Sequence, residues 1–189
     1  MGGADHGGQY GRCTGGRISY AAGMDRDRRA TPNTVPWPPL LYGGAAVLAL
    51  LLDRAVPLPA VWVGGQWLVV RGGGGVMLVV GLALDLWAMA TMWRHKANIM
   101  PHRAATALVT HGPFALSRNP IYLGNTVLLF GAGLAFGMAW FIPAAFLAAG
   151  LTGHLAIARE EAHLNARFGR EWREYRLRVN RWVGRSTRR

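Results

Sequence analysis

The feature that most constrains this chain is the separation of its charged residues from its long apolar stretches. Between residues 37 and 158 most of the sequence is uncharged, whereas basic residues gather in the first 35 residues, over 94–118 and after residue 158. A helix that crosses a membrane needs about 20 mostly apolar residues, with its charges at the two ends. The pattern is therefore typical of a protein with several transmembrane helices.

The formal net charge of +12 also fits a nucleic-acid-binding protein, but the position of the charge disfavours that interpretation. Nucleic-acid-binding domains carry basic stripes on a folded soluble surface. Here the basic residues flank apolar stretches, and a cytoplasmic location beside anionic lipid accounts for them. We expect membrane lipids as partners, and no nucleic acid. The single cysteine, Cys13, excludes an intrachain disulfide and a thiolate metal cluster.

Four apolar stretches predict four transmembrane helices. They cover about 37–52, 76–93, a third from residue 120 and a fourth ending near 158, and the last two meet in a tight turn over 137–140. The glycine cluster 72–75 predicts a flexible lead-in to the second helix. Residues 60–70 are too few to cross roughly 30 Å of hydrocarbon, so we expect them at the interface or re-entrant. A fifth crossing by residues 60–70 is the alternative.

The sequence thus predicts an all-α integral membrane protein with four transmembrane helices, or five, and a helical cytoplasmic C-terminal segment. Four crossings place both tails and the basic middle segment on the cytoplasmic side of a multi-pass protein in the cell inner membrane. Residues 1–35 are rich in glycine and charge, which predicts a disordered basic cytoplasmic tail. The membrane domain covers 36–183, and 184–189 form a basic C-terminal tail.

Polar and small residues inside the expected spans predict contacts between helices. Asp85 lies near the middle of the second span, where a carboxylate is costly unless it faces the protein interior, so we expect it to face inward. Gly133 and Gly137 are expected to permit close helix packing. No metal site is expected in the middle segment, because no carboxylate or cysteine clusters with its histidines His95, His102 and His111.

The segment 108–122 carries the strongest chemical signal. Asn119 suits an N-cap and Pro120 the first helical position, so the third span should begin there with free amide groups that attract anions. Arg118 lies just outside this helix start and Tyr122 one turn inside it, so a guanidinium and a phenol can converge. Membrane anchoring, with arginine at a headgroup and tyrosine in the aromatic belt, explains these residues as well as a functional site does.

A second charged group follows the fourth span. Glu160 and Glu161 are adjacent, and Glu161, Leu164 and Phe168 share a helical face that Gly169 would end as a C-cap. The ordinary explanation is that both carboxylates are exposed and balance nearby arginines. For an exposed carboxylate we expect the change to glutamine to alter stability by less than about 0.5 kcal/mol.

Blocks in the second half of the chain form one ordered pattern. They are Leu108-Val109, Gly112-Pro113-Phe114, Arg118-Asn119-Pro120-Ile121-Tyr122, Glu160-Glu161, Leu164, Phe168-Gly169, Tyr175 and residues 179–182. This pattern resembles the isoprenylcysteine carboxyl methyltransferase family and the related membrane phospholipid methyltransferases, over roughly residues 76–183. The chain departs from the commonest eukaryotic form at Asn119, where histidine is usual, and at Asn180, where proline is frequent.

The resemblance implies a membrane methyltransferase-like domain that uses S-adenosylmethionine at the cytoplasmic membrane face. Arg118 and Glu161 are the implied catalytic residues. The implied cofactor-binding residues are Leu108, Val109, His111, Gly112, Pro113, Phe114, Arg118, Asn119, Pro120, Tyr122, Glu160 and Glu161.

The resemblance leaves the lipophilic or membrane-associated methyl acceptor open, since the family spans prenylated cysteine, phospholipid amines and small thiols. A carboxylate acceptor is already nucleophilic, and Arg118 could hold it by paired hydrogen bonds. An amine or thiol must lose a proton, for which Glu160, Glu161 or His111 could serve.

Two other functions explain part of the pattern. Membrane reductases of related architecture bind a nicotinamide cofactor in a similar pocket, but they are generally much longer. A non-enzymatic membrane scaffold or transporter component would place its arginine-rich tail on anionic lipid, without accounting for the two ordered blocks. Binding of S-adenosylmethionine distinguishes the three.

Overall fold

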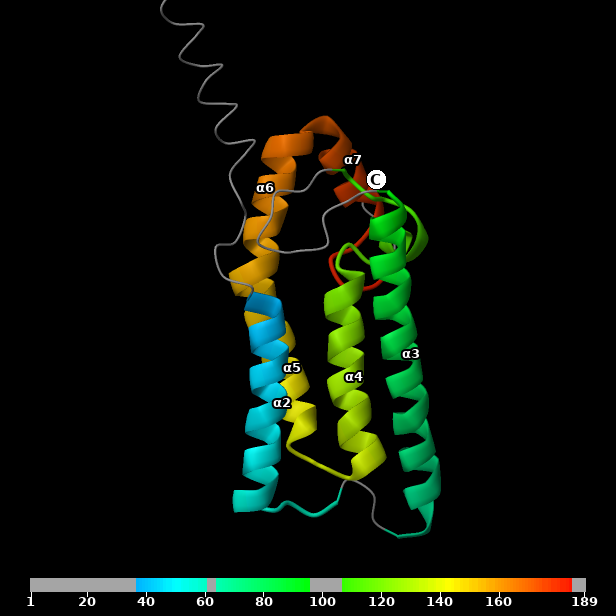
Figure 1. Cartoon of the computed structure of the whole chain (residues 1–189), viewed down its shortest axis with the longest axis vertical. Helices are drawn as coiled ribbons and strands as arrows, with labels where there is room; N and C mark the ends of the chain where they lie inside the picture. Colours follow the sequence, from blue (N-terminus) through cyan, green and yellow to red (C-terminus); the bar gives the residue numbers. More distant parts are fainter. Residues whose placement is uncertain (1–36, 61–63, 96–106, 185–189) are drawn as a thin grey trace, which may run out of the picture.

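The computed structural model describes residues 37–60, 64–95 and 107–184, and the regular structure in these ranges is helical. The expected N-terminal tail and the residues around His102 lie outside the described residues. Four helices run alternately up and down (Figure 1). They are α2 (Trp37–Ala55), α3 (Trp67–Arg94), α4 (Pro120–Phe136) and α5 (Phe141–Thr152). The shorter elements are η1 (Gly64–Gln66), η2 (Gly112–Ala115), the π-helical segment η3 (Gly153–Ile157), α6 (Ala158–Phe168) and α7 (Arg170–Arg178).

Two helices are long and apolar enough to cross a membrane. They are α3 and the continuous helix formed by α5, η3 and α6, each with 28 residues, or about 42 Å at the usual helical rise. On the side of α3 away from the bundle, Val69 and Val79 are 77 % and 69 % exposed, as expected for contact with lipid. The all-helical fold class is therefore confirmed, while the count of four crossings stays a prediction.

An apolar core forms where α2, α4 and α5 meet. Tyr42 and Ala49 of α2 pack with Leu129 of α4 and with Phe141 and Ala145 of α5. Gly137, in the left-handed conformation at φ 75°, ends α4, and α5 begins at Phe141. The tight turn expected between the third and fourth spans is confirmed.

Helices α3 and α4 pack so closely that glycine is required at their contact points. A Cβ at Gly74 would lie 2.8 Å from the Gly131 carbonyl oxygen, and a Cβ at Gly81 would lie 2.9 Å from that of Gly124. The prediction of a flexible glycine lead-in was wrong, because residues 72–75 lie inside α3. Residues 67–70 also belong to α3, so this part of the 60–70 stretch continues into the second predicted span, and its place relative to a membrane stays a prediction.

Asp85 and Gly133 behave as their positions in the sequence predict. Asp85 is 8 % exposed and lies against Gly124 of α4, so it faces inward. A Cβ at Gly133 would lie 3.1 Å from the Cβ of Phe141, which confirms close packing there between α4 and α5. Gly137, at φ 75°, makes the turn after α4.

Candidate functional site

The predicted site residues lie at one end of the bundle. The C-terminal end of α3, the N-terminal end of α4, and α6 and α7 all lie there (Figure 1). Helix α4 begins at Pro120, as predicted, directly after the loop that contains η2. The middle loop and the C-terminal segment, which are far apart in the sequence, therefore lie together at this end.

Backbone hydrogen bonds fasten the middle loop to the chain after α7. The amide of Arg118 donates to the carbonyl of Asn180 at 3.1 Å, and the amide of Gly184 donates to the carbonyl of Leu116 at 2.9 Å. These bonds use main-chain atoms alone. They fix the register between two segments that lie about 60 residues apart in the sequence.

Asn119 strengthens the same junction instead of capping α4. Its side-chain amide donates to the carbonyl of Arg181 at 3.0 Å, and its backbone amide donates to the hydroxyl oxygen of Ser117 at 3.0 Å. The position of Asn119 at the N-cap is as predicted, but the expected side-chain cap is absent there. Instead, the side-chain nitrogen of Asn119 donates to the Arg181 carbonyl, which directs this side chain to the C-terminal segment.

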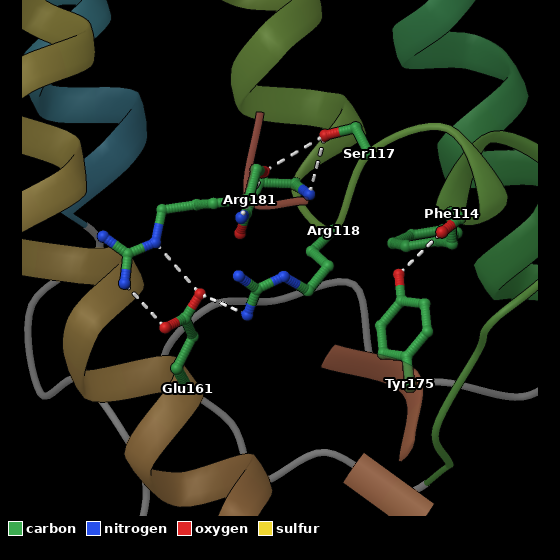
Figure 2. A network of polar contacts seen from close by, with 7 residues as sticks. Phe114, Ser117, Arg118, Glu161, Tyr175 and Arg181 are labelled. Carbon is green, nitrogen blue, oxygen red and sulfur yellow. Dashed lines mark hydrogen bonds and ion pairs between the residues drawn. The ribbon is translucent and has the colours of Figure 1, made fainter. Parts of the chain in front are cut away.

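Glu161 joins α6 to both segments through two arginines. Figure 2 shows its Oε1 atom accepting hydrogen bonds from Arg118 Nη1 at 2.8 Å and Arg181 Nε at 3.0 Å, while Oε2 accepts from Arg181 Nη2 at 2.7 Å. The side chains of Arg118 and Glu161 are 10 % and 14 % exposed. The expectation of an exposed Glu161 balancing local arginines was wrong, because the fold brings it two partners that lie 43 and 20 residues away.

Burial and hydrogen bonding act on the two guanidinium groups in opposite directions. Burial lowers the pKa of Arg118, although Glu161 opposes the shift, and the hydrogen bond to Glu161 raises the pKa of Arg181. Both groups remain charged at neutral pH, since an arginine begins above 12. The cluster of Arg118, Glu161 and Arg181 thus carries two positive charges and one negative charge.

The adjacent carboxylate, Glu160, points to a different helix. Its Oε2 atom accepts a hydrogen bond from the phenol of Tyr122, in the first turn of α4, at 3.2 Å. Neighbouring positions on a helix differ in direction by about 100°, so the two glutamates serve separate partners. The predicted residues Arg118, Asn119, Tyr122, Glu160 and Glu161 are thereby linked by contacts between the loop, α4, α6 and the C-terminal segment.

An aromatic cluster packs beside the charged residues. Trp172 and Tyr175 of α7 are each 2 % exposed, and the phenol of Tyr175 donates to the carbonyl of Phe114 at 2.7 Å (Figure 2). Burial raises the pKa of Tyr175, which keeps the phenol protonated as a donor. The guanidinium carbon of Arg118 lies 5.7 Å from the centre of the Trp172 ring. The cluster also contains Val179, Leu108, Phe114, Leu164 and Phe168.

The remaining predicted residues have packing positions. Val109, Pro113 and Pro120 are buried. His111 is exposed, and its ring lies 4.3 Å from that of His95 at the end of α3. Gly112 has φ 63°, the left-handed region in which glycine is favoured, beside Thr91 of α3. His111 thus contacts α3, whereas Leu108 and Phe114 pack in the aromatic cluster.

Three residues that the sequence-based site omitted contribute to this arrangement. Arg181 binds Glu161, Tyr175 binds the loop, and Trp172 lies under Arg118. Tyr175 and Arg181 belong to the ordered blocks on which the family resemblance rests, so the sequence pattern could have identified both as site residues. Their roles depend on contacts across the fold that spacing does not encode.

Among the buried polar atoms at this end, besides His163 Nε2, two N–H donors have no hydrogen-bond partner in the described part of the chain. They are Arg118 Nε and Trp172 Nε1. Buried donors are usually paired, so each is able to serve a bound molecule or water. Within the same ranges, no group of three or more His, Cys, Asp or Glu side chains is placed to hold a metal ion.

Comparison with protein families matched residues 69–171 to the family described as phospholipid methyltransferase. The match covers more than half of the 189 residues. It includes the middle loop, α4 and both glutamates, and it ends before Trp172 and Arg181. Comparisons with curated proteins and with solved structures gave no match.

Proposed function

Because this chain belongs to the phospholipid methyltransferase family, in the group that includes the isoprenylcysteine carboxyl methyltransferases, we propose that it transfers a methyl group from S-adenosylmethionine to a lipophilic acceptor. The acceptor classes are a carboxylate of an isoprenylcysteine-like molecule, a lipid amine and a thiol. We place the reaction at the cytoplasmic face of the cell inner membrane. The family makes the chain a methyltransferase and a membrane protein, and the donor, acceptor and face are the proposal.

The observation that carries the proposal is the cluster of Arg118, Glu161 and Arg181. It unites the two blocks of the family pattern in one place, at the charged end of an otherwise apolar bundle. The side chain of Glu161 is 14 % exposed and accepts three hydrogen bonds there, so the two guanidinium groups are held at a fixed position at this end. Ordered, buried charge of this kind is typical of functional sites.

The residues at this end fit the charges of S-adenosylmethionine, which has a carboxylate, an ammonium group and a positively charged sulfur. The unpartnered Nε of Arg118 and the free amides at the start of α4 suit the carboxylate. Glu160 gives one oxygen to Tyr122 and has a second oxygen for a cationic group. Both oxygens of Glu161 already bind arginines, so we assign Glu161 to holding Arg118 in place.

Bound S-adenosylmethionine would supply an electrophilic methyl group, whose transfer needs alignment and exclusion of water more than acid–base strength. Arg118 orients an anionic group, and the aromatic residues Trp172 and Tyr175 keep water from the base of the site. With an amine or thiol acceptor, the free carboxylate oxygen of Glu160 takes the proton. With a carboxylate acceptor no proton moves.

Binding and turnover of the purified full-length protein test the proposal. We expect radiolabelled S-adenosylmethionine to bind, and methyl transfer to occur to at least one of a prenylcysteine, phosphatidylethanolamine and a long-chain thiol. Glu160→Gln and Arg118→Ala should each weaken binding, by roughly tenfold or more for Arg118, since a charged hydrogen bond contributes about 1.5 to 3 kcal/mol. Binding of a nicotinamide cofactor in place of S-adenosylmethionine would refute the proposal.

A further inference from the structure

Helix α2 lies outside the family-matched segment, and yet one of its side chains reaches the candidate site. Tyr42 is 5 % exposed and lies in the core between α2, α4 and α5. Phenylalanine would fill a purely apolar position equally well, whereas a hydroxyl in such surroundings loses its hydration unless a partner replaces it. The partners of the Tyr42 hydroxyl therefore indicate its role.

The Tyr42 hydroxyl binds the first turn of α4. It donates to the carbonyl oxygen of Tyr122 at 2.9 Å and lies 2.7 Å from the hydroxyl oxygen of Thr126. Thr126 in turn donates to the same Tyr122 carbonyl at 2.8 Å. Three oxygens share two hydroxyl protons, so either hydroxyl can be the one that donates to the other. In one arrangement Tyr42 donates to the Tyr122 carbonyl directly, and in the other it donates to Thr126, which donates to that carbonyl.

Tyr122 carries this contact onward to the candidate site. Its side chain points to α6 and donates to Glu160 Oε2, while its carbonyl receives the bonds from Tyr42 and Thr126. One residue thus connects α2 to the carboxylate that has a free oxygen for the cofactor. A shift of the Tyr122 peptide would move the phenol, and with it the hydrogen bond that orients Glu160.

We propose that Tyr42 is a positioning residue of the methyl-transfer site, which fixes the Tyr122 peptide and thereby the Tyr122–Glu160 contact. This inference rests on the proposed function. By this inference α2 helps to position the site residues, although the family match begins only at residue 69. Tyr42 acts through Tyr122 and does not itself touch the reacting groups.

A double-mutant cycle between Tyr42→Phe and Tyr122→Phe tests the inference, with the dissociation constant of S-adenosylmethionine measured on full-length protein in detergent. We expect Tyr42→Phe to raise this constant roughly threefold to tenfold, the effect of one neutral hydrogen bond. In the Tyr122→Phe background the same change should have little effect, because the phenol through which Tyr42 acts is already absent. Thermal unfolding is measured on all four proteins.

Phe141→Leu is the matched control, since Phe141 packs in the same core without joining the hydroxyl network. It should lower Tm and leave the dissociation constant unchanged. An equal rise in the constant from Tyr42→Phe in both backgrounds, or no rise in either, would overturn the positioning role while leaving the proposed function intact. A wild-type protein that does not bind S-adenosylmethionine would overturn both.

Discussion

Glu161 lies where three segments of the chain are held together by side-chain charge. If glutamine replaces it, one of the carboxylate oxygens becomes an NH2 group that faces an arginine donor, and two guanidinium groups lose their counter-charge. We expect Glu161→Gln to destabilise the folded protein by about 1 to 3 kcal/mol, because partners of a largely buried charge are left unpaired. Thermal unfolding of the detergent-purified protein measures the effect.

Glu174→Gln is the control for this prediction. Glu174 also pairs with an arginine, Arg170, at 2.7 Å, but the two side chains are 55 % and 87 % exposed. Exposed pairs of this kind contribute little because water screens them. We expect no measurable change in Tm from Glu174→Gln. Similar losses from both variants would show that burial of the Glu161 cluster is not what stabilises the junction.

Tyr175 gives a prediction that depends on pH. Its phenol donates to the carbonyl of Phe114, and burial raises its pKa above the ordinary value of 10.0. The folded state therefore keeps the proton when the unfolded chain begins to lose it, and the stability that Tyr175 contributes is complete below pH 10 and declines above it. Tyr175→Phe should cost about 1 kcal/mol at pH 7.

The measurement is the difference in Tm between the wild type and Tyr175→Phe across a pH series. We expect a constant difference from pH 7 to about 9 and a smaller one above about 10, where ionisation favours the unfolded wild type. A difference that grows above pH 10 would contradict the assignment of Tyr175 as a buried donor.

At the scale of helices, the contact between α3 and α4 depends on a few glycines chosen by the neighbouring backbone. Gly74→Ala would place a Cβ 2.8 Å from both the Gly131 oxygen and the Leu134 carbonyl carbon, and backbone atoms cannot turn away as a side chain can. We expect a loss of about 1 to 3 kcal/mol from the forced separation of the helices. Thermal unfolding and cofactor binding report the effect, since α4 also carries Tyr122.

Gly73→Ala is the matched control one residue away. A Cβ at Gly73 meets nothing within 4 Å, so the substitution should be neutral or should stabilise α3 by up to about 1 kcal/mol through better helix propensity. The two variants change the same residue type in the same helix. Equal effects would refute the packing role of Gly74.

The glycine cluster also shows what a single sequence can predict about these elements. Charge placement and the Asn119-Pro120 pair located the start of α4, and Gly169 ends α6 as expected, because these signals are local. The glycines at 72–75 led to the wrong prediction of a flexible segment, because the sequence does not show that Gly131 of α4 lies against this part of α3. Arg181 was missed as the partner of Glu161 for the same reason, since α7 and its turn bring it back across 20 residues.

At the scale of the whole molecule, the direction of each helix constrains the number of crossings. Helix α3 runs from the far end of the bundle to the site end, and the continuous α5–η3–α6 helix does the same (Figure 1). If both cross a membrane, α4 must return between them. Its 17 residues span about 26 Å, close to the roughly 30 Å of hydrocarbon. Helix α2 runs beside α5 in the opposite direction, and with α2 as a further crossing the expected total is four.

The distribution of arginine predicts which end is cytoplasmic. Arg94, Arg118 and Arg181, with the arginines of α6 and α7, lie at the site end, whereas Arg54 and Arg71 lie at the other. Basic residues near the ends of membrane helices are retained in the cytoplasm. We therefore expect the site to face the cytoplasm, where the proposed donor S-adenosylmethionine and acceptors in the inner leaflet would reach it.

Labelling of introduced cysteines tests this orientation, because Cys13 is the sole native cysteine and Cys13→Ser provides a clean background. Leu58→Cys lies in the exposed connection after α2, and Arg173→Cys lies on an exposed position of α7. In intact bacterial spheroplasts, a membrane-impermeant maleimide should label position 58 at once and position 173 only after lysis. Labelling of both positions before lysis would place them on the same side and contradict the three crossings by α3, α4 and α5–α6 that separate them. Labelling of position 173 alone would reverse the orientation and place the site outside, away from the cytoplasmic S-adenosylmethionine that the proposed reaction requires.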